Sequence, residues 1–392
     1  MLLDETYSTE VRHRVPRIAI TRLSATSIYR FTPPLLATIA RGFHVPLSSL
    51  GVAVSVSELI GLGVPFLARR VERWPRRTTI LIGLFGMVLG AVAASVTTGP
   101  VTFSLALMLI SLSKSCVDIG TNSWVTDHVP YGRLARVIGI TEMSWSGALL
   151  IGVPVLLGVS ALTGWRGGFI AGAGFAILCG FVFVMPFPRE RPLMTTGDAE
   201  ERRSLVRSAI PTVLAVALLT AGSQSAFVTF GSWLHDRFGF GDGALAGIAF
   251  LLGLGELTAS FTTSRLTDRW GKRQSMRRGA SLMVPTAVLL AIGLSAHLGT
   301  GLVLLVLFFL GFEFAIVSSI SLTSNLIPGR PSAGIGFGIA AGTFGRAVAA
   351  IPATRLYDSH GFGGSMILAG GCAAACALIL IRPSGGTTST FT

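Results

Sequence analysis

The chain has 392 residues, of which 51% are hydrophobic and 12% are charged, and its formal net charge is +13. Soluble domains carry about 25% charged residues. This composition excludes a soluble fold and predicts a protein whose apolar surface faces lipid. The positive charge lies in short segments between apolar runs, as in the loops of membrane proteins, so we also exclude a nucleic-acid-binding protein.

Twelve apolar runs of about 20 residues predict an all-α membrane protein with twelve transmembrane helices. A polar tail, 1–17, precedes them, and a second, 383–392, follows. The longest polar connection, 188–208, separates an amino-terminal half, 18–187, from a carboxy-terminal half, 209–382. The predicted spans are 18–40, 47–68, 78–97, 101–125, 137–162, 167–187, 209–232, 244–264, 279–298, 301–326, 333–353 and 362–381.

An internal repeat indicates that the two halves are copies of one unit. The segment 70–77 returns as 266–273, at an offset of 196 residues. A second echo has an offset of 198 and relates Pro130, Gly147 and Pro154 to Pro328, Gly345 and Pro352. Two related halves joined by a loop are typical of solute carriers. We therefore expect two pseudo-symmetric six-helix bundles.

The distribution of Lys and Arg predicts the orientation of these bundles. The side that holds both tails and the central loop carries 23 of these residues, and the opposite side carries four. The positive-inside rule therefore places both termini in the cytoplasm and the protein in the cytoplasmic membrane.

The repeated loop resembles a motif of the major facilitator superfamily: Gly, three residues, Asp, Arg, any residue, Gly and two basic residues. The second copy fits from Asp268 onward, with Ser264 where Gly is usual. In the first copy Glu72 stands for Asp and Pro75 for the second Gly. The resemblance implies a loop that latches the two halves in the outward-open state, although a plain positive-inside cluster is the alternative. The candidate gating residues are Asp268, Arg269, Gly271, Arg273, Glu72, Arg73 and Arg77.

Small residues and proline predict a bend or a close helix contact in spans five and eleven. They are Gly147, Gly152 and Pro154 in span five and Gly345 and Pro352 in span eleven. The span-five segment also resembles, incompletely, the corresponding segment of the family's exporters of drug or sugar efflux type.

Ionisable residues within the spans should face a partner or water, because each costs roughly 2.5–3.5 kcal/mol at mid-bilayer on insertion scales. We expect Arg22 and Glu142, near the predicted span ends, to reach the surface. Lys114 and Asp118 are four residues apart and can form an ion pair. The full set is Arg22, Arg30, Lys114, Arg346, Glu58, Asp118, Glu142, Glu256 and Glu313.

The balance of these charges indicates proton coupling. If ion pairs form within halves, the carboxy-terminal half has only Arg346 for Glu256 and Glu313. An unpaired carboxylate in apolar surroundings holds a proton more readily than one in water, as a proton carrier must. A static salt-bridge network is the alternative. The proton-coupling candidates are Glu256, Glu313, Asp118, Glu58, Arg346 and Lys114.

Arg30 precedes Pro33-Pro34, which must disturb the first span. A mid-membrane Arg at irregular backbone either binds an anionic group of the substrate or pairs with Glu58 or Asp118. Further residues that line a cavity or pack between helices are Tyr29, Asn122, Trp145 and Gln224.

The sequence therefore predicts a monomeric secondary transporter that exports a small molecule in exchange for protons by rocking of its two halves. An uptake carrier for an organic anion and a flippase for lipid head groups remain alternatives, as do a transporter-like sensor and a membrane-embedded enzyme. The sequence contains no phosphate-binding loop, no metal-ligand spacing and no nucleophile–base pair. We therefore expect no enzymatic activity, no cofactor and no metal.

Overall fold

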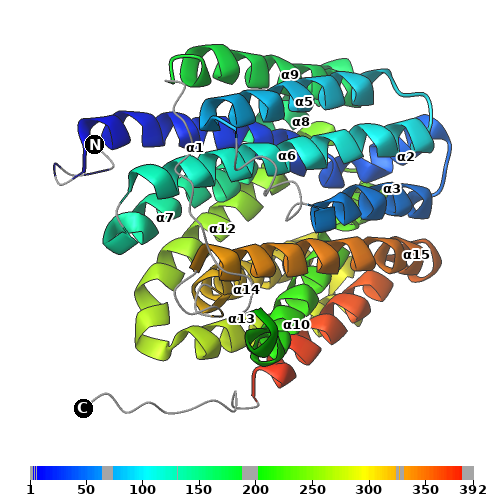
Figure 1. Ribbon diagram of the computed structural model, residues 1–392. Helices are drawn as coiled ribbons and strands as arrows, with labels where there is room; N and C mark the ends of the chain where they lie inside the picture. Colours follow the sequence, from blue (N-terminus) through cyan, green and yellow to red (C-terminus); the bar gives the residue numbers. More distant parts are fainter. Residues whose placement is uncertain are drawn as a thin grey trace. The chain divides into compact units, whose positions relative to one another are not determined.

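The computed structural model describes residues 3, 5, 7–63, 74–129, 131–187, 202–323, 326 and 331–381. These residues are helical apart from short connections (Figure 1). The α-helices are α1 (Thr9–Phe31), α2 (Leu36–Phe43), α3 (Leu47–Leu59), α5 (Arg76–Val96), α6 (Pro100–His128), α7 (Tyr131–Gly147), α8 (Val153–Thr163), α9 (Trp165–Cys179), α10 (Arg202–Phe227), α11 (Phe230–Phe238), α12 (Asp242–Trp270), α13 (Lys272–Ala291), α14 (Leu298–Thr323) and α15 (Pro331–Ile379). Short 3₁₀ turns are η1 (Pro33–Leu35), η2 (Ile60–Gly63) and η5 (Leu294–Ala296), and π-helical turns are η3 (Ala148–Gly152) and η4 (Gly180–Val184).

Each of the twelve predicted spans overlaps one of these helical segments. Eight of the described helices are long and apolar enough to cross a membrane. The last of them, α15, contains two predicted spans and is divided at Gly361, whose φ of 64° lies in the left-handed region that glycine tolerates. The first span is also divided, because Pro33 and Pro34 lack the N–H groups that would continue α1 into α2.

The chain forms two compact units. The first contains residues 1–194 and 227–257, and the second contains residues 195–226 and 258–392. The boundaries fall within α10 and α12. As a result, α11 and the first part of α12 pack with the amino-terminal helices.

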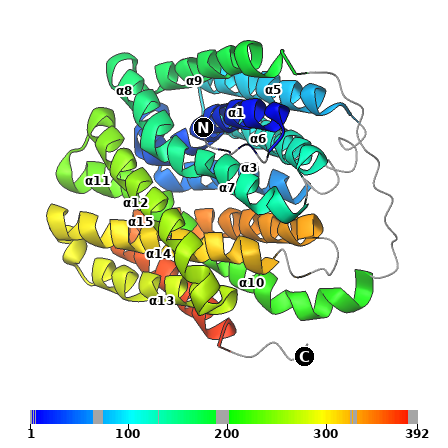
Figure 2. The ribbon, with the colours of Figure 1, turned by 90° about the vertical axis from the view of Figure 1, so that its left-hand side faces the viewer.

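Within the first unit, α5 lies between α6 and α9, as Figures 1 and 2 both show. A Cβ atom on Gly83 of α5 would lie 2.7 Å from the Val117 side chain and 2.9 Å from the Ser113 carbonyl of α6. Within the second unit, Gly279 of α13 approaches α14 in the same way, with its Cβ position 2.5 Å from the Gly311 carbonyl. The two glycines are 196 residues apart, so the sequence repeat is also a repeat of helix packing.

The glycines of spans five and eleven also contact neighbouring helices closely. A Cβ on Gly152 would lie 1.8 Å from the Ser27 hydroxyl of α1, and one on Gly345 would lie 2.0 Å from the Ala217 carbonyl of α10. Gly152 ends the π-helical turn η3, two residues before Pro154. Wide turns and proline are the usual causes of helix bends, so span five has both a close contact and a source of bending.

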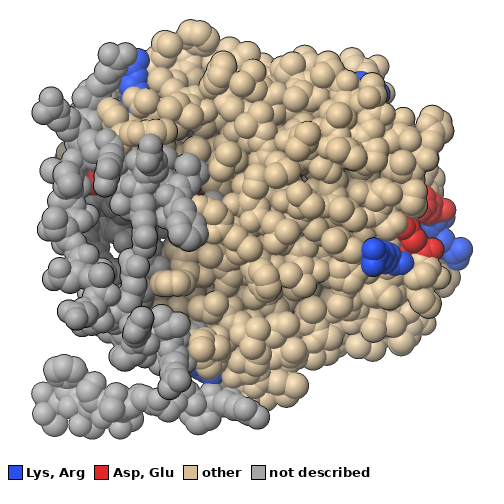
Figure 3. Space-filling model, turned by 45° about the vertical axis from the view of Figure 1, so that its right-hand side comes forward, with Lys and Arg blue, Asp and Glu red and all other residues tan. Residues whose placement is uncertain are grey.

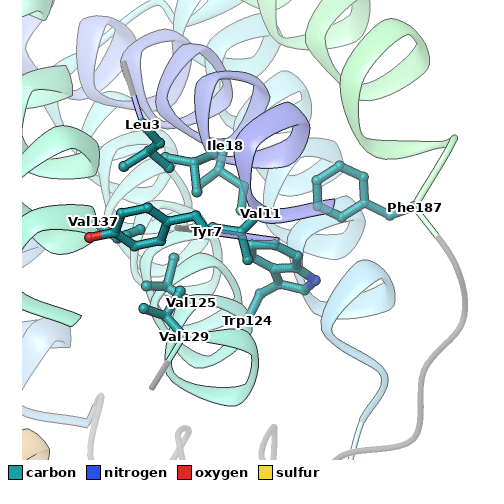
Figure 4. Close-up of a cluster of buried hydrophobic side chains, with 10 residues drawn as sticks. Leu3, Tyr7, Val11, Ile18, Trp124, Val125, Val129, Val137 and Phe187 are labelled. Atoms are coloured by element: carbon teal, nitrogen blue, oxygen red, sulfur yellow. The ribbon is translucent and has the colours of Figure 1, made fainter. Parts of the chain in front are cut away.

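The amino-terminal segment differs from the predicted polar tail 1–17. Helix α1 begins at Thr9, and the side chains of Leu3, Tyr7, Val11 and Val15 are buried. Figure 4 shows this segment on an apolar cluster at the ends of α6, α7 and η4. The cluster contains Leu3, Tyr7, Val11, Val15, Ile18, Trp124, Val125, Val129, Val137 and Phe187. Within α1 the residues Val11, Val15 and Ile18 follow one another at intervals of four and three, which places them on one face of the helix.

Large apolar side chains are exposed on the surface of the helices, including Leu162, Val101 and Val96. The face in Figure 3 carries few charged side chains among the residues that are described, and those visible lie at its margins. Such a surface is unfavourable in water and is what a bilayer core requires.

Candidate functional site

A buried ion pair joins α1 to α12. The guanidinium of Arg30 donates through Nη1 to Glu256 Oε2 at 2.8 Å and through Nη2 to Glu256 Oε1 at 2.6 Å. Only 5% of the Arg30 side chain and 1% of the Glu256 side chain are exposed. Two parallel charge-assisted hydrogen bonds fix both distance and orientation, so this pair holds the two helices in one register.

Aromatic rings and a carbonyl enclose the Arg30 guanidinium. Its Cζ lies 4.7 Å from the ring centroid of Trp145 and 5.2 Å from that of Phe227. Nη1 also donates to the Trp145 carbonyl at 3.0 Å. Cation–π contacts are strongest where water is excluded, so these contacts hold the guanidinium in place.

This pairing corrects two expectations. Arg30 pairs with neither Glu58 nor Asp118, and Glu256 is not a leftover carboxylate. The charge count assumed that pairs form within each half of the sequence, whereas these residues are 226 positions apart. Helix packing brings the predicted first and eighth spans together. A count of charges within one half of the sequence cannot detect such a contact.

A second network lies in the same unit and surrounds Arg22 of α1. Nη1 donates to Asn122 Oδ1 at 2.9 Å, Nη2 donates to Glu142 Oε1 at 2.7 Å, and Nε lies 3.5 Å from Asp118 Oδ1. Asp118 also forms the predicted ion pair with Lys114, one turn earlier on α6. Two bases and two acids therefore meet in one network whose formal charges sum to zero.

The expectation that Arg22 reaches the surface is wrong, whereas Glu142 is partly exposed, with 35% of its side chain accessible. The Arg22 side chain is only 6% exposed and contacts three polar side chains, two on α6 and one on α7. Helix α1 begins at Thr9 rather than at residue 18, so Arg22 lies more than three turns inside it. The sequence signal was the spacing of Arg22, Thr26 and Arg30 on one helix face.

Trp145 of α7 lies between the two networks. Its ring centroid is 4.7 Å from the Arg30 guanidinium carbon and 5.8 Å from the Lys114 ammonium, and the Tyr29 ring is 6.3 Å away. The Tyr29 hydroxyl in turn donates to Glu58. Four of the predicted site residues, Tyr29, Asn122, Trp145 and Arg30, are thus brought together with Lys114 and Asp118.

The remaining candidates lie elsewhere. Glu313 of α14 accepts a hydrogen bond from Ser260 at 2.9 Å, and Arg346 of α15 donates to Thr343 at 3.2 Å. Gln224 is a buried residue of α10. All three belong to the second unit.

The repeated loop supplies equivalent contacts in both units. Arg77 donates to the Phe187 carbonyl at 3.0 Å, at the end of span six. Arg273 donates to the Leu380 and Ile379 carbonyls at 3.1 and 3.2 Å, at the end of span twelve. Cations are favourable near the unpaired carbonyls of a helix C-terminus.

The other gating candidates of the repeated loop show no such contact or lie outside the described residues. Arg269 is exposed and Gly271 has a φ of 82°. Glu72 and Arg73 lie outside the described residues, as do the side chain of Asp268 and residues Pro130 and Pro328.

These contacts predict a measurable role for the repeated arginines. Arg273→Ala should lower the free energy of unfolding by about 1.5–3 kcal/mol, the usual range for a hydrogen bond to a charged group. Arg77→Ala should have a similar effect, because its contact is equivalent. Thermal unfolding of the purified protein measures both. The control Arg277→Ala, one turn further along α13, should change stability by less than about 0.5 kcal/mol; equal effects of all three would refute the capping role.

The long apolar helices define a polytopic membrane protein. Comparison with known proteins agrees: residues 18–350 match the family model of the Major Facilitator Superfamily. The chain belongs to this superfamily. It is accordingly an integral membrane protein.

Sequence relatives are distant. The chain is 26% identical over 252 residues to the MFS-type transporter YwfA of Bacillus subtilis (strain 168), which covers 62% of this chain and 61% of that protein. It is 24% identical over 242 residues to a chloramphenicol resistance protein of Streptomyces lividans, with 60% and 62% covered. The matched region is therefore less than two thirds of the length of either relative.

The fold is shared with solved transporters. A bacterial homologue of the human lysosomal transporter Spinster, in an inward-facing and unoccupied conformation, matches with a TM-score of 0.72 at 13% identity. The match covers 95% of each chain. At this identity the likeness shows the fold alone.

Proposed function

We propose that this protein is a proton-coupled secondary exporter of a small molecule, with Glu256 as the group that takes up the proton. The observation that carries the proposal is the buried, two-fold hydrogen-bonded pair of Arg30 and Glu256. A charged pair at this depth is costly unless both partners stay together. This cost leads us to assign the pair a switching role.

The pair makes proton binding depend on conformation. While α12 lies against α1, Arg30 stabilises Glu256 as a carboxylate. When the two helices separate, Glu256 loses its cation in apolar surroundings and a proton takes the place of that cation. Reforming the pair expels the proton. Opposite proton affinities in two conformations are what a coupled carrier requires.

Further contacts between the same segments support a gate. The Thr38 hydroxyl of α2 donates to Asp242 Oδ1 of α12 at 3.0 Å. The Cβ position of Gly231 in α11 lies 2.2 Å from the Pro34 carbonyl of η1. In the predicted orientation these contacts are on the non-cytoplasmic side, so their separation would admit protons from outside and release substrate there. This orientation rests on the Lys and Arg count.

Export is favoured over the anion-uptake alternative by the chemistry of Arg30. Both of its Nη groups already donate hydrogen bonds to Glu256 or to the Trp145 carbonyl. An anionic substrate would have to compete with these partners. A distant relative that is a chloramphenicol resistance protein is in keeping with export. The protein would thus act as a monomeric carrier that exchanges its substrate for protons.

The test is proton movement in proteoliposomes that contain a pH-sensitive dye. We would add tetraphenylphosphonium, glucose and benzoate as cationic, neutral and anionic probes. At least one should induce a proton flux that falls about tenfold or more in Glu256→Gln, a change of about 1.4 kcal/mol in the barrier. Glu10→Gln, which alters an acid on the exposed amino-terminal segment, serves as the control. Probe transport without proton flux, or full flux in Glu256→Gln, would refute the proposal.

A further inference from the structure

The Lys114 ammonium occupies a position that resembles a ligand site. It is paired with the Asp118 carboxylate and lies 5.8 Å from the ring centroid of Trp145. A carboxylate together with an aromatic face is how proteins recognise organic cations. A side chain of the protein itself thus holds the place that an external ammonium would take.

We propose that this place is the binding site of an organic cation, which displaces the Lys114 ammonium and causes Lys114 to release its proton. The inference rests on the proposed function for the statement that a small molecule is carried, and it adds the substrate class. It also adds a second titrating group beside Glu256.

Exposure favours a cation over an anion. The two acids of the network are partly accessible, with 31% of the Asp118 side chain and 35% of the Glu142 side chain exposed. The two bases beneath them, Arg22 and Lys114, are 6% and 7% exposed. An approaching molecule therefore meets the side chains of the acids before those of the bases. Trp145 and Tyr29 add aromatic surface beside them.

Charge balance determines what must leave when a cation binds. Arg22, Lys114, Asp118 and Glu142 together carry no net charge, and a further cation would leave one positive charge uncompensated in the membrane. A guanidinium does not lose its proton in proteins, whereas an ammonium can. The N–H bond of Lys114 therefore breaks, its electron pair stays on the nitrogen, and the proton passes to water at the exposed carboxylates. One cation is exchanged for one proton.

The groups that face Lys114 come from three helices. Asp118 lies on the same helix, α6, Arg22 lies on α1, and Glu142 and Trp145 lie on α7. Substitution of any of these four residues would change the affinity for the cation. Only Lys114 both carries a proton at neutral pH and can release it. This makes a Lys-to-Arg exchange the sharpest variant.

The experiment uses the full chain, purified in detergent, in weakly buffered solution near neutral pH. Tetraphenylphosphonium is the probe; equilibrium dialysis measures its binding and an indicator dye measures proton release. The wild type should release about one proton per bound cation. Lys114→Arg keeps the charge but should abolish proton release and weaken binding about tenfold. Glu10→Gln should match the wild type.

A second pair of variants guards against misfolding of the charge variants. Trp145→Phe keeps an aromatic face and should bind within a few-fold of the wild type, whereas Trp145→Leu should bind about tenfold more weakly. Absence of binding, binding without proton release, or unchanged release in Lys114→Arg would overturn the inference.

These outcomes are separable from the proposed function. Binding and proton release in detergent need neither a membrane gradient nor movement of Glu256 away from Arg30. If both occur in detergent but no proton flux is seen in vesicles, the antiport proposal fails and the cation site stands. If vesicles show flux with glucose or benzoate and detergent samples bind no tetraphenylphosphonium, the cation site fails alone.

Discussion

Arg30→Leu should lower the free energy of unfolding by about 3–5 kcal/mol, the usual cost of removing one partner of a buried ion pair. The reason is that Glu256, only 1% exposed, would lose both hydrogen bonds to its partner and would stay buried either as an uncompensated charge or as an acid that has had to bind a proton. Arg30→Leu/Glu256→Leu should recover most of this loss, because apolar side chains of similar volume often replace a buried pair without penalty. Thermal unfolding of the four proteins in detergent gives the coupling energy of the pair.

A transport measurement distinguishes a switching role of the Arg30–Glu256 pair from a purely structural one. The double variant should be stable yet fail to couple proton flux to substrate, because it has no titrating group between α1 and α12. Strictly additive losses of stability would mean that Arg30 and Glu256 do not interact. A stable double variant with normal coupled flux would instead show the pair to be a passive connection.

Gly231→Val should reduce transport by about tenfold or more. The Cβ position of Gly231 is already 2.2 Å from the Pro34 carbonyl and 3.0 Å from its carbonyl carbon, and backbone atoms cannot rotate away as a side chain can. Valine would therefore keep α11 apart from η1. If this contact closes and opens during each cycle, the variant cannot complete the closed state.

The matched control is Gly247→Val in α12. Nothing lies within 4 Å of the Cβ position of Gly247, so valine there should leave transport within about twofold. Initial rates in proteoliposomes, normalised to the amount of folded protein from gel filtration, compare the two. Equal rates for both variants would remove the Gly231–Pro34 contact from the transport cycle.

Local spacing predicted the part of the site that depends on a single helix. Lys114 and Asp118 are one turn apart on α6, so their ion pair followed from the sequence. The contact of Arg30 with Glu256 did not, because it depends on how helices 226 residues apart meet. Neither periodicity nor charge balance contains that information.

Helix ends were the second source of error. A predicted start at residue 18 placed Arg22 within reach of the surface, whereas α1 begins at Thr9. The missed signal was the recurrence of Leu3, Tyr7, Val11, Val15 and Ile18 at intervals of three or four residues, all of which belong to one apolar cluster. Charged residues on the other faces obscured it in a search for long apolar runs. The twelve spans themselves were predictable because about 20 apolar residues are needed to cross a bilayer.

The apolar cluster at the amino terminus has a consequence for synthesis. Leu3 and Phe187 belong to the same cluster and are 184 positions apart (187 minus 3). At about 5–20 residues per second, ribosomes need roughly 10–40 s to add that much chain. During that interval Leu3, Tyr7 and Val11 cannot yet pack against Phe187, the last residue of the cluster to be synthesised. This segment is therefore synthesised well before its packing in the first unit can be completed.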